Sequence, residues 1–236
     1  MQVITGGSGK LGRALAREFP SALRPTRAEL ELRDHGSVRA YFLAKQPSLV
    51  IHTSAMTDIR RAEQEREACW DMNVRGTERL VETLQSAGPD CMFVYLSTAC
   101  VFDGGRGNYG EADVPDPKNY YALSKLVGEY VAQRMSQWLV VRTNFVERGP
   151  WPYPKAFVDR FGTYLYADDV ARVLRRLVSE SMTGLVHIAG DQRLSMYELA
   201  RKTSPEVGRL TMADVNLPLT VDMTLRSTRI PPTRIS

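Results

Sequence analysis

Short apolar runs and longer segments with helical spacing alternate along the chain. The apolar runs are of the kind that forms buried strands, and they cover residues 1–7, 48–55, 91–98, 138–143 and 184–190. The segments whose apolar residues recur at helical spacing cover residues 10–19, 58–85, 119–135, 167–180 and 195–203. Strands that alternate with helices of this length form a parallel sheet with both faces covered. The pattern therefore predicts an α/β fold with a doubly wound parallel sheet.

A glycine-rich turn joins the first strand to the first helix. The stretch TGGSGKLG places Gly6, Gly9 and Gly12 three residues apart, with Lys10 and Leu11 between the last two. Glycines at this spacing allow a tight turn and a close approach of the backbone to a pyrophosphate, which then faces the N–H groups at the start of the helix. A plain turn is the alternative. Because the turn opens the first βα unit, it favours a dinucleotide site of the Rossmann type.

The residues after the first helix bear on which dinucleotide binds. NAD sites usually carry an acidic side chain at the end of the second strand, where it binds the ribose 2′-hydroxyl. Here the stretch SALRPTRAEL has Arg24 and Arg27 and no acid before Glu29. Guanidinium groups pair with phosphate through two parallel hydrogen bonds. The stretch therefore favours NADP(H), although NAD(H) remains open, as does the alternative that these are exposed loop arginines.

A tyrosine and a lysine lie one helical turn apart in the segment 119–135. Tyr121 and Lys125 have the spacing i and i+4, which places them on one face of the helix. An ammonium beside a phenol favours the phenolate, so we expect Lys125 to lower the pKa of Tyr121 from about 10 toward neutral pH. A tyrosine with such a pKa suits general acid catalysis at a carbonyl oxygen. A hydroxyl from Thr98 or Ser97 completes the predicted catalytic group.

Seven segments, in order along nearly the whole chain, resemble the extended short-chain dehydrogenase/reductases, and most closely the dTDP-4-dehydrorhamnose reductase group. They read TGGSGKLG, PSLVIHTSAMTDIRRAE, NVRG, STACVFDG, YYALSKLVGE, GTYLYADDVA and LRSTRI. The resemblance implies a Rossmann-type sheet with a small, reduced C-terminal substrate lobe. We therefore expect a core that binds NADP(H) and holds the catalytic residues over 1–143. The reduced lobe is expected over 144–236, interleaved with the last sheet elements in one compact unit.

The resemblance also assigns residues to the cofactor. Glu31 and Leu32 fall where the family has an Asp-Ile pair near the adenine, and Ser54, Ala55 and Met56 line a strand end beside the cofactor. The residues expected at the cofactor are Gly6, Gly9, Lys10, Leu11, Gly12, Arg24, Arg27, Glu31, Leu32, Ser54, Ala55, Met56, Tyr121 and Lys125.

The reaction implied by the resemblance is hydride transfer from the nicotinamide to the C4 carbonyl of a nucleotide-linked 4-keto-6-deoxysugar. Tyr121 is expected to protonate the carbonyl oxygen and Thr98 to donate a hydrogen bond to it. Lys125 is expected to bind the nicotinamide ribose. These three residues form the expected catalytic set.

The substrate side departs from the family pattern. Ala99 and Cys100 stand where the reductases usually have Asp and Tyr, and the segment after residue 143 is short. The residues expected beside the substrate are Ser97, Thr98, Ala99, Cys100, Asn144 and Trp151. Because the catalytic set is complete, the departures indicate a changed substrate.

Two other functions are compatible with the same residues. One is a non-catalytic NADP-binding regulatory subunit of the same fold, a role that the methionine adenosyltransferase beta-subunit shows to exist in this group. The other is a reductase or epimerase that acts on a different carbonyl substrate, since the substrate lobe is small.

Composition and charge narrow the remaining classes. The 236 residues carry a net charge of +4, but basic and acidic residues are interspersed, which argues against nucleic-acid binding. Cys69, Cys91 and Cys100 lack metal-site spacing, so we expect reduced thiols and no metal site. No apolar run approaches the roughly 18 residues of a membrane span, and no leader sequence precedes the first strand. We therefore expect a cytoplasmic enzyme for a small-molecule substrate, with a homodimer possible.

Overall fold

A five-stranded parallel sheet forms the centre of the computed structural model, which describes residues 1–87 and 90–235. The strands lie in the order β1-β2-β3-β4-β9, and every neighbouring pair is parallel. They are β1 (Gln2–Thr5), β2 (Leu49–His52), β3 (Met92–Thr98), β4 (Gln137–Thr143) and β9 (Gly184–Ile188). The predicted Rossmann-type α/β fold is confirmed.

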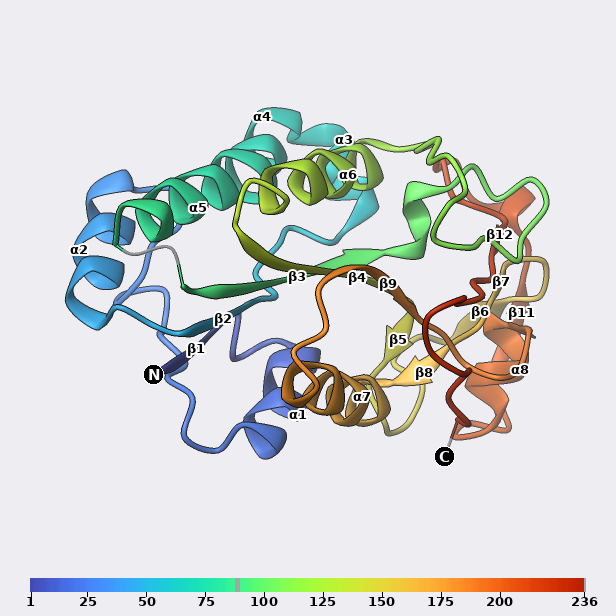
Figure 1. The fold of residues 1–236 in the computed structure, drawn as a ribbon. Helices are drawn as coiled ribbons and strands as arrows, with labels where there is room; N and C mark the ends of the chain where they lie inside the picture. Colours follow the sequence, from blue (N-terminus) through green and yellow to red (C-terminus); the bar gives the residue numbers. More distant parts are fainter. Residues whose placement is uncertain (88–89, 236) are drawn as a thin grey trace.

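Helices cover both faces of this sheet (Figure 1). The helices α2 (His35–Lys45), α5 (Gly76–Ala87) and α6 (Tyr120–Ala132) cover one face, and α1 (Lys10–Glu18) and α7 (Ala167–Ser179) cover the other. In Figure 1, α5 and α6 lie above the sheet and α1 and α7 below it. The sheet is therefore the middle of three layers.

Side chains that alternate along each strand fill the two cores. Val3 and Val50 pack toward α2 and α5, whereas Ile4 and Ile51 pack toward α1 and α7. Successive strand residues point to opposite faces, and here both faces are covered, so both sets are apolar. This explains why the strands are continuous apolar runs in the sequence.

The segment 58–85, expected to be helical in two pieces, forms four. They are α3 (Ile59–Gln64), α4 (Arg66–Trp70), a π-helix (Asp71–Arg75) and α5. Asp58 caps the first piece by accepting a hydrogen bond from the Arg61 N–H at 2.9 Å. The π-helix is a local widening of the turn that is frequent at functional sites.

Residues 20–34, which follow the first helix, contribute only one bridge to the sheet. Leu23 accepts a hydrogen bond from the Ile4 N–H and donates one to the Gln2 carbonyl, on the free side of β1. Arg24 follows this bridge directly. The loop therefore starts at the carboxyl end of the sheet, beside the glycine turn.

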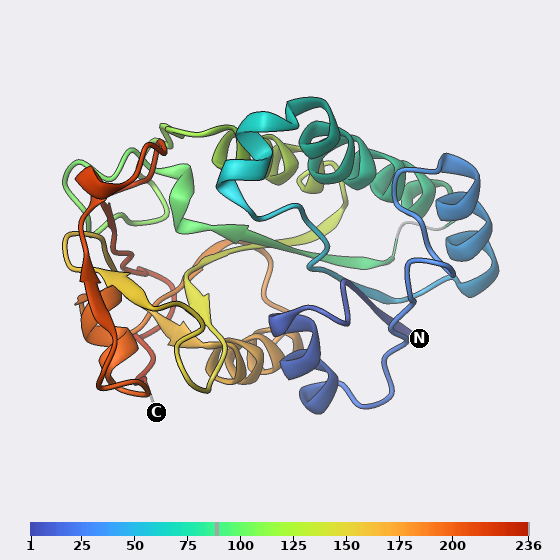
Figure 2. The ribbon, with the colours of Figure 1, turned by 180° about the vertical axis from the view of Figure 1, so that it is seen from behind.

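Small strands and one short helix gather beyond the carboxyl ends of the main strands, at the left of Figure 2. The small sheets pair β10-β7-β12, β11-β6 and β5-β8. Their members are β5 (Phe145–Val146), β6 (Lys155–Phe157), β7 (Phe161–Gly162), β8 (Leu165–Tyr166), β10 (Leu194–Ser195), β11 (Gly208–Leu210) and β12 (Asp222–Met223). The helix is α8 (Met196–Arg201), and 3-10 turns cover Ala99–Val101 and Met212–Asp214. The boundary expected after residue 143 stays a prediction. Of the elements that follow residue 143, β9 lies in the main sheet.

Side chains from the loop after β3 and from the C-terminal segment cover the free edge of β9. The Glu111 carboxylate accepts a hydrogen bond from the His187 N–H at 3.0 Å. The Arg229 guanidinium donates to the carbonyls of Thr183 and Leu185 at 2.8 and 2.9 Å. Exposed strand edges invite pairing with other chains, and these side chains occupy the edge instead. Among residues 1–87 and 90–235, every helix falls short of the length and apolar character needed to cross a bilayer.

Candidate functional site

The glycine turn after β1 has the tight geometry that its spacing predicts. Gly6 has φ +72°, and a Cβ there would lie 2.8 Å from the Ser54 N atom in the loop after β2. A Cβ on Gly12 would collide with the Gly6 carbonyl oxygen. Helix α1 begins after Gly9 with no side chain capping its N-terminus. Its first N–H groups therefore remain available to an anion.

A cleft of about 530 Å³ extends from this turn across the carboxyl ends of β1 and β2. Nine of the residues expected at the cofactor line it: Gly6, Gly9, Arg24, Arg27, Glu31, Leu32, Ser54, Ala55 and Met56. The other five lie outside its lining; two of them, Tyr121 and Lys125, are on α6. Leu11 is buried in the core, Gly12 packs on the Gly6–Gly7 backbone, and Lys10 is exposed at the start of α1.

Arginines dominate one end of the cleft. Arg24, Arg27, Arg33 and Arg61 all line the cleft, and Glu31 is the carboxylate in its lining; Arg61 pairs with Glu65 outside it. Glu31 accepts hydrogen bonds from Arg27 at 2.6 Å and from Arg33 at 3.1 Å, so its charge is already matched. The net charge at this end of the cleft is therefore positive.

The three expected catalytic residues meet at the carboxyl end of β3. Thr98 ends that strand, and its hydroxyl accepts a hydrogen bond from the Cys100 N–H at 3.1 Å. A hydrogen bond from Thr98 to Tyr121 lowers the pKa of that phenol, whereas burial, the larger effect, raises it. Lys125 lies one turn further along α6 and is only 3% exposed.

The expected effect of Lys125 on Tyr121 is wrong for this structure. Burial raises the pKa of Tyr121, and the Lys125 charge is not among its causes. Instead, burial lowers the pKa of Lys125 itself to about 7, although Glu129 acts to raise it. Removing both groups from water favours their neutral forms. At neutral pH the phenol therefore keeps its proton, which is the form that a general acid requires.

Asn73, on the π-helix, links the cofactor side of the site to the catalytic helix. Its amide oxygen accepts a hydrogen bond from the Met56 N–H at 2.7 Å, and its amide nitrogen donates to the Ser124 hydroxyl at 2.8 Å. Ser124 directly precedes Lys125. The segment NVRG marks this residue in the sequence, but its partners, 17 and 51 residues away, cannot be read from it.

A buried ion pair joins α6 to β4. Glu129 binds the Arg142 guanidinium through two hydrogen bonds, at 2.9 and 2.6 Å, and both side chains are almost fully buried. The Ser97 hydroxyl donates to the same carboxylate. Ser97, expected beside the substrate, is therefore engaged in the support of α6. Its neighbour Thr98 is the strand-end hydroxyl that reaches Tyr121.

The other residues expected at the substrate lie around the end of β3. Ala99 and Cys100 are buried in the 3-10 turn that follows Thr98. Asn144 is buried and donates from its amide to the Met223 carbonyl at 3.0 Å. The Trp151 indole N–H donates to the Lys155 carbonyl at 3.2 Å, which ties this side chain to its own loop. Contact of these residues with a substrate stays a prediction.

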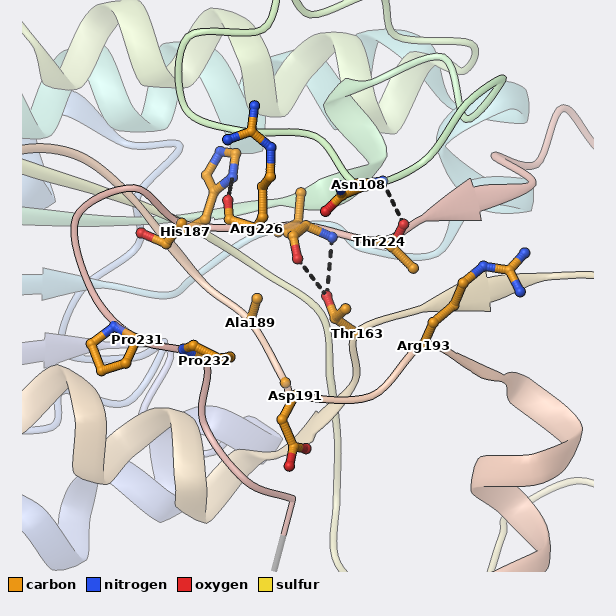
Figure 3. A pocket seen from close by; sticks show the side chains of 13 residues that line it. Asn108, Thr163, His187, Ala189, Asp191, Arg193, Thr224, Arg226, Pro231 and Pro232 are labelled. Carbon is orange, nitrogen blue, oxygen red and sulfur yellow. Dashed lines mark hydrogen bonds between the residues drawn. The ribbon is translucent and has the colours of Figure 1, made fainter.

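A second pocket, of about 330 Å³, lies at the end of β9 under the C-terminal segment (Figure 3). Its polar groups bind one another: His187 faces the Arg226 carbonyl at 3.0 Å, and the Leu225 N–H donates to Thr163 at 3.1 Å. None of the expected site residues lines it. The described residues also hold no group of three or more His, Cys, Asp or Glu suited to a metal ion.

Comparison with known proteins places this site in a family. The family model for the RmlD substrate binding domain matches residues 1–150. Methionine adenosyltransferase 2 subunit beta from Danio rerio is 29% identical over 234 residues, covering 84% of this chain and 71% of that protein. A dTDP-4-dehydrorhamnose reductase from Aggregatibacter actinomycetemcomitans is 27% identical over 226 residues, covering 84% of this chain and 76% of that protein.

Solved structures agree with this placement. A hypothetical dTDP-4-dehydrorhamnose reductase from Sulfolobus tokodaii has a TM-score of 0.83 at 28% identity, covering 97% of this chain and 92% of that one. A dTDP-4-dehydrorhamnose reductase from Bacillus anthracis, solved in complex with NADP, has a TM-score of 0.86 at 22% identity, covering 95% of this chain and 89% of that one. The second likeness concerns the fold alone. The chain therefore belongs to the RmlD substrate binding domain family, as the order of its motifs predicts.

Proposed function

We propose that this protein is an NADP(H)-dependent reductase of the short-chain dehydrogenase/reductase type that acts on a nucleotide-linked keto sugar. The observation that carries the proposal is the meeting of Thr98, Tyr121 and Lys125 at the end of β3, beside the cleft that follows the glycine turn. Relatives named dTDP-4-dehydrorhamnose reductase support a 4-keto-6-deoxysugar as substrate, with reduction at C4.

The cleft residues fit a dinucleotide with a 2′-phosphate. The turn at Gly6 and Gly12 leaves no room for side chains, and the uncapped start of α1 suits a pyrophosphate. The arginine-rich end of the cleft suits a phosphate group, because Arg24 lines it and no carboxylate pairs with Arg24 among the described residues. NADP bound to a protein of similar fold supports the same choice.

The bound cofactor supplies the hydride, and the side chains control the proton. Tyr121 donates its proton to the carbonyl oxygen as the hydride arrives. When substrate is bound, the Thr98 hydroxyl, a neighbour of Tyr121, donates its hydrogen bond to the same carbonyl oxygen. Lys125, whose pKa is about 7, carries positive charge below that pH and would bind the nicotinamide ribose one helical turn from Tyr121.

The assay that tests this proposal measures NADPH oxidation with a panel of nucleotide-linked 4-keto sugars. Wild-type protein and Tyr121→Phe are compared under the same conditions. Turnover by the wild type that the variant lacks supports the reductase. Turnover that survives in the variant would show that Tyr121 is not the acid.

A second candidate is a non-catalytic NADP-binding subunit. It is favoured by the relatives named methionine adenosyltransferase 2 subunit beta. On this candidate NADPH raises the melting temperature but no carbonyl compound is reduced. Turnover of a carbonyl compound outside the sugar panel would instead support the third possibility, a reductase or epimerase with another substrate. The cytoplasmic location and the homodimer stay predictions.

A further inference from the structure

Arg160 is a buried arginine that lacks an acidic partner. The residue is 9% exposed and lies between β6 and β7. Its Nε donates to the Thr220 carbonyl at 3.0 Å, and its Nη2 lies 3.3 Å from the Met223 sulfur. The sulfurs of Met196 and Cys100 lie at 3.7 and 3.9 Å. Thioether and thiol sulfurs are weak acceptors, so one neutral carbonyl is the only strong acceptor that the guanidinium has within the described chain.

The acids nearest in sequence and space are already engaged. Both Asp159 oxygens accept from the Met212 N–H at 3.0 Å. Asp222 accepts from Arg193 at 2.9 Å and from the Thr224 hydroxyl at 2.7 Å. Across residues 1–87 and 90–235, no carboxylate forms an ion pair with Arg160. A buried charge without a counter-charge is costly, and proteins keep one where it has a use.

Two further buried groups in the same region have unmet hydrogen bonds. The Tyr164 hydroxyl and the Thr220 hydroxyl have no partner among the described residues. Thr220 contacts Arg160 through its backbone carbonyl, and Tyr164 lies four residues after Arg160 along the chain. A guanidinium and two hydroxyls without hydrogen-bond partners can together donate hydrogen bonds to the oxygens of an anion.

This cluster adjoins the candidate catalytic residues. The Cys100 sulfur contacts Arg160, and the Cys100 N–H donates to the Thr98 hydroxyl. Cys100 also belongs to the apolar cluster on which Tyr121 packs. One residue therefore separates the guanidinium from the hydroxyl that is expected at the reacting carbonyl. Ala99 and Cys100, the two residues that follow Thr98, carry no carboxylate that could pair with Arg160.

We propose that Arg160 binds an oxyanion carried by the substrate close to its reacting carbonyl. The ligand class is a keto compound with a carboxylate or phosphate group, which is a substrate other than a 4-keto-6-deoxysugar, whose diphosphate is on C1. The proposal rests on the reductase function, because it places the anion beside Tyr121. The guanidinium has a planar pair of N–H donors, and this pair matches the two oxygens of a carboxylate or phosphate group.

The test compares wild type with Arg160→Met, which fills the site with a side chain like its sulfur neighbours and removes the charge. Calorimetric titration at saturating NADP+ measures the binding of inorganic pyrophosphate and, separately, of malonate. We expect one of the two to bind the wild type, and Arg160→Met to weaken that binding at least tenfold. Binding of pyrophosphate alone identifies a phosphate source, and binding of malonate alone a carboxylate source. Equal binding to wild type and variant overturns the proposal.

Stability separates this role from a structural one. Because Arg160→Met removes an uncompensated buried charge, the melting temperature of the variant should equal or exceed that of the wild type. A lower melting temperature with unchanged anion binding means that Arg160 only supports the fold. Should the methionine variant fail to fold, Arg160→Lys keeps the charge and loses the planar fork. It should bind the anion more weakly than the wild type, and equal affinity contradicts the proposal.

Two controls keep the outcome distinct from that of the proposed reductase function. Arg193→Met changes an exposed arginine of the same lobe, one that is paired with Asp222, and should leave anion binding intact. The NADPH-induced rise in melting temperature should be the same in all variants. Loss of that rise in the wild type would defeat the NADP-dependent function while anion binding by Arg160 could still be measured.

Discussion

The Lys125 ammonium lies 4.0 Å from the centre of the Tyr95 ring, in a site from which water is excluded. A cation over an aromatic face is stabilised by the ring quadrupole. The contact offsets part of the burial that lowers the pKa of Lys125 to about 7. The two residues come from different elements, β3 and α6, and together they fix the ammonium one turn below Tyr121.

Reductase activity should fall as the pH rises through about 7. Below its pKa, Lys125 is charged and donates charge-assisted hydrogen bonds to the nicotinamide ribose that we propose it binds, and above it this charge is lost. The profile of kcat against pH checks this. Tyr95→Leu removes the cation–π contact and should shift the fall to lower pH. A fall at the same pH in both proteins would show that Tyr95 does not tune Lys125.

Tyr121→Phe should reduce turnover by about 10²-fold or more, because it removes the proton donor. NADPH should still raise the melting temperature of the variant, since the cleft after the glycine turn is intact. The measurement pairs initial rates with thermal unfolding at matched NADPH concentrations. Leu123→Ala, an exposed change on the same helix, serves as the control and should leave the rate near wild type.

Replacing both Arg24 and Arg27 by alanine should reduce the preference for NADPH over NADH by about tenfold or more. Each arginine can form charge-assisted hydrogen bonds with a 2′-phosphate, and NADH offers no such group. Fluorescence titration of both cofactors gives the ratio of their dissociation constants. Arg39→Ala, an exposed arginine on α2 outside the cleft, is the matched control. An unchanged ratio in the double variant would remove the support for NADP(H) at this position.

The free energy of unfolding should fall as the pH drops below 6.5. His52 is buried against the Thr5 and Thr77 hydroxyls, and burial lowers its pKa to about 3. Between pH 6.5 and 3 the unfolded chain binds a proton that the folded chain does not, so acid favours unfolding by up to about 1.4 kcal/mol per pH unit. Urea unfolding between pH 7 and 5 measures the slope. His52→Gln should flatten it in part, because burial also lowers the pKa of His187.

Glu129→Gln should destabilise the fold by about 3–5 kcal/mol, because it leaves the Arg142 guanidinium buried without a counter-charge. Urea unfolding measures the loss. The double variant Glu129→Leu with Arg142→Met should recover much of the stability, since no charge is then left unpaired. A double variant as unstable as the single one would mean that packing, and not charge, makes this pair necessary.

The sequence by itself determined the strands of the main sheet and their order along the chain. Apolar runs such as 91–98 became strands because both faces of a parallel sheet are buried, and this leaves a signal in consecutive residues. The glycine turn and the Tyr121–Lys125 spacing are equally local. The break of the segment 58–85 into four pieces was not predicted, because a π-helix depends on what its residues face and not on their propensity.

Only the tertiary structure decided how the site works. The Asn73–Ser124 and Glu129–Arg142 contacts join residues 51 and 13 positions apart, and Arg160 meets Cys100 across 60. Such contacts leave no periodic pattern in the sequence. The sign of the shift at Tyr121 also required the structure, because proximity to Lys125 predicts a lower pKa while burial, which no spacing reveals, raises it. Local periodicity therefore determined the main sheet and its helices. Contacts among a few buried side chains that are far apart in the sequence determined the chemistry of the site.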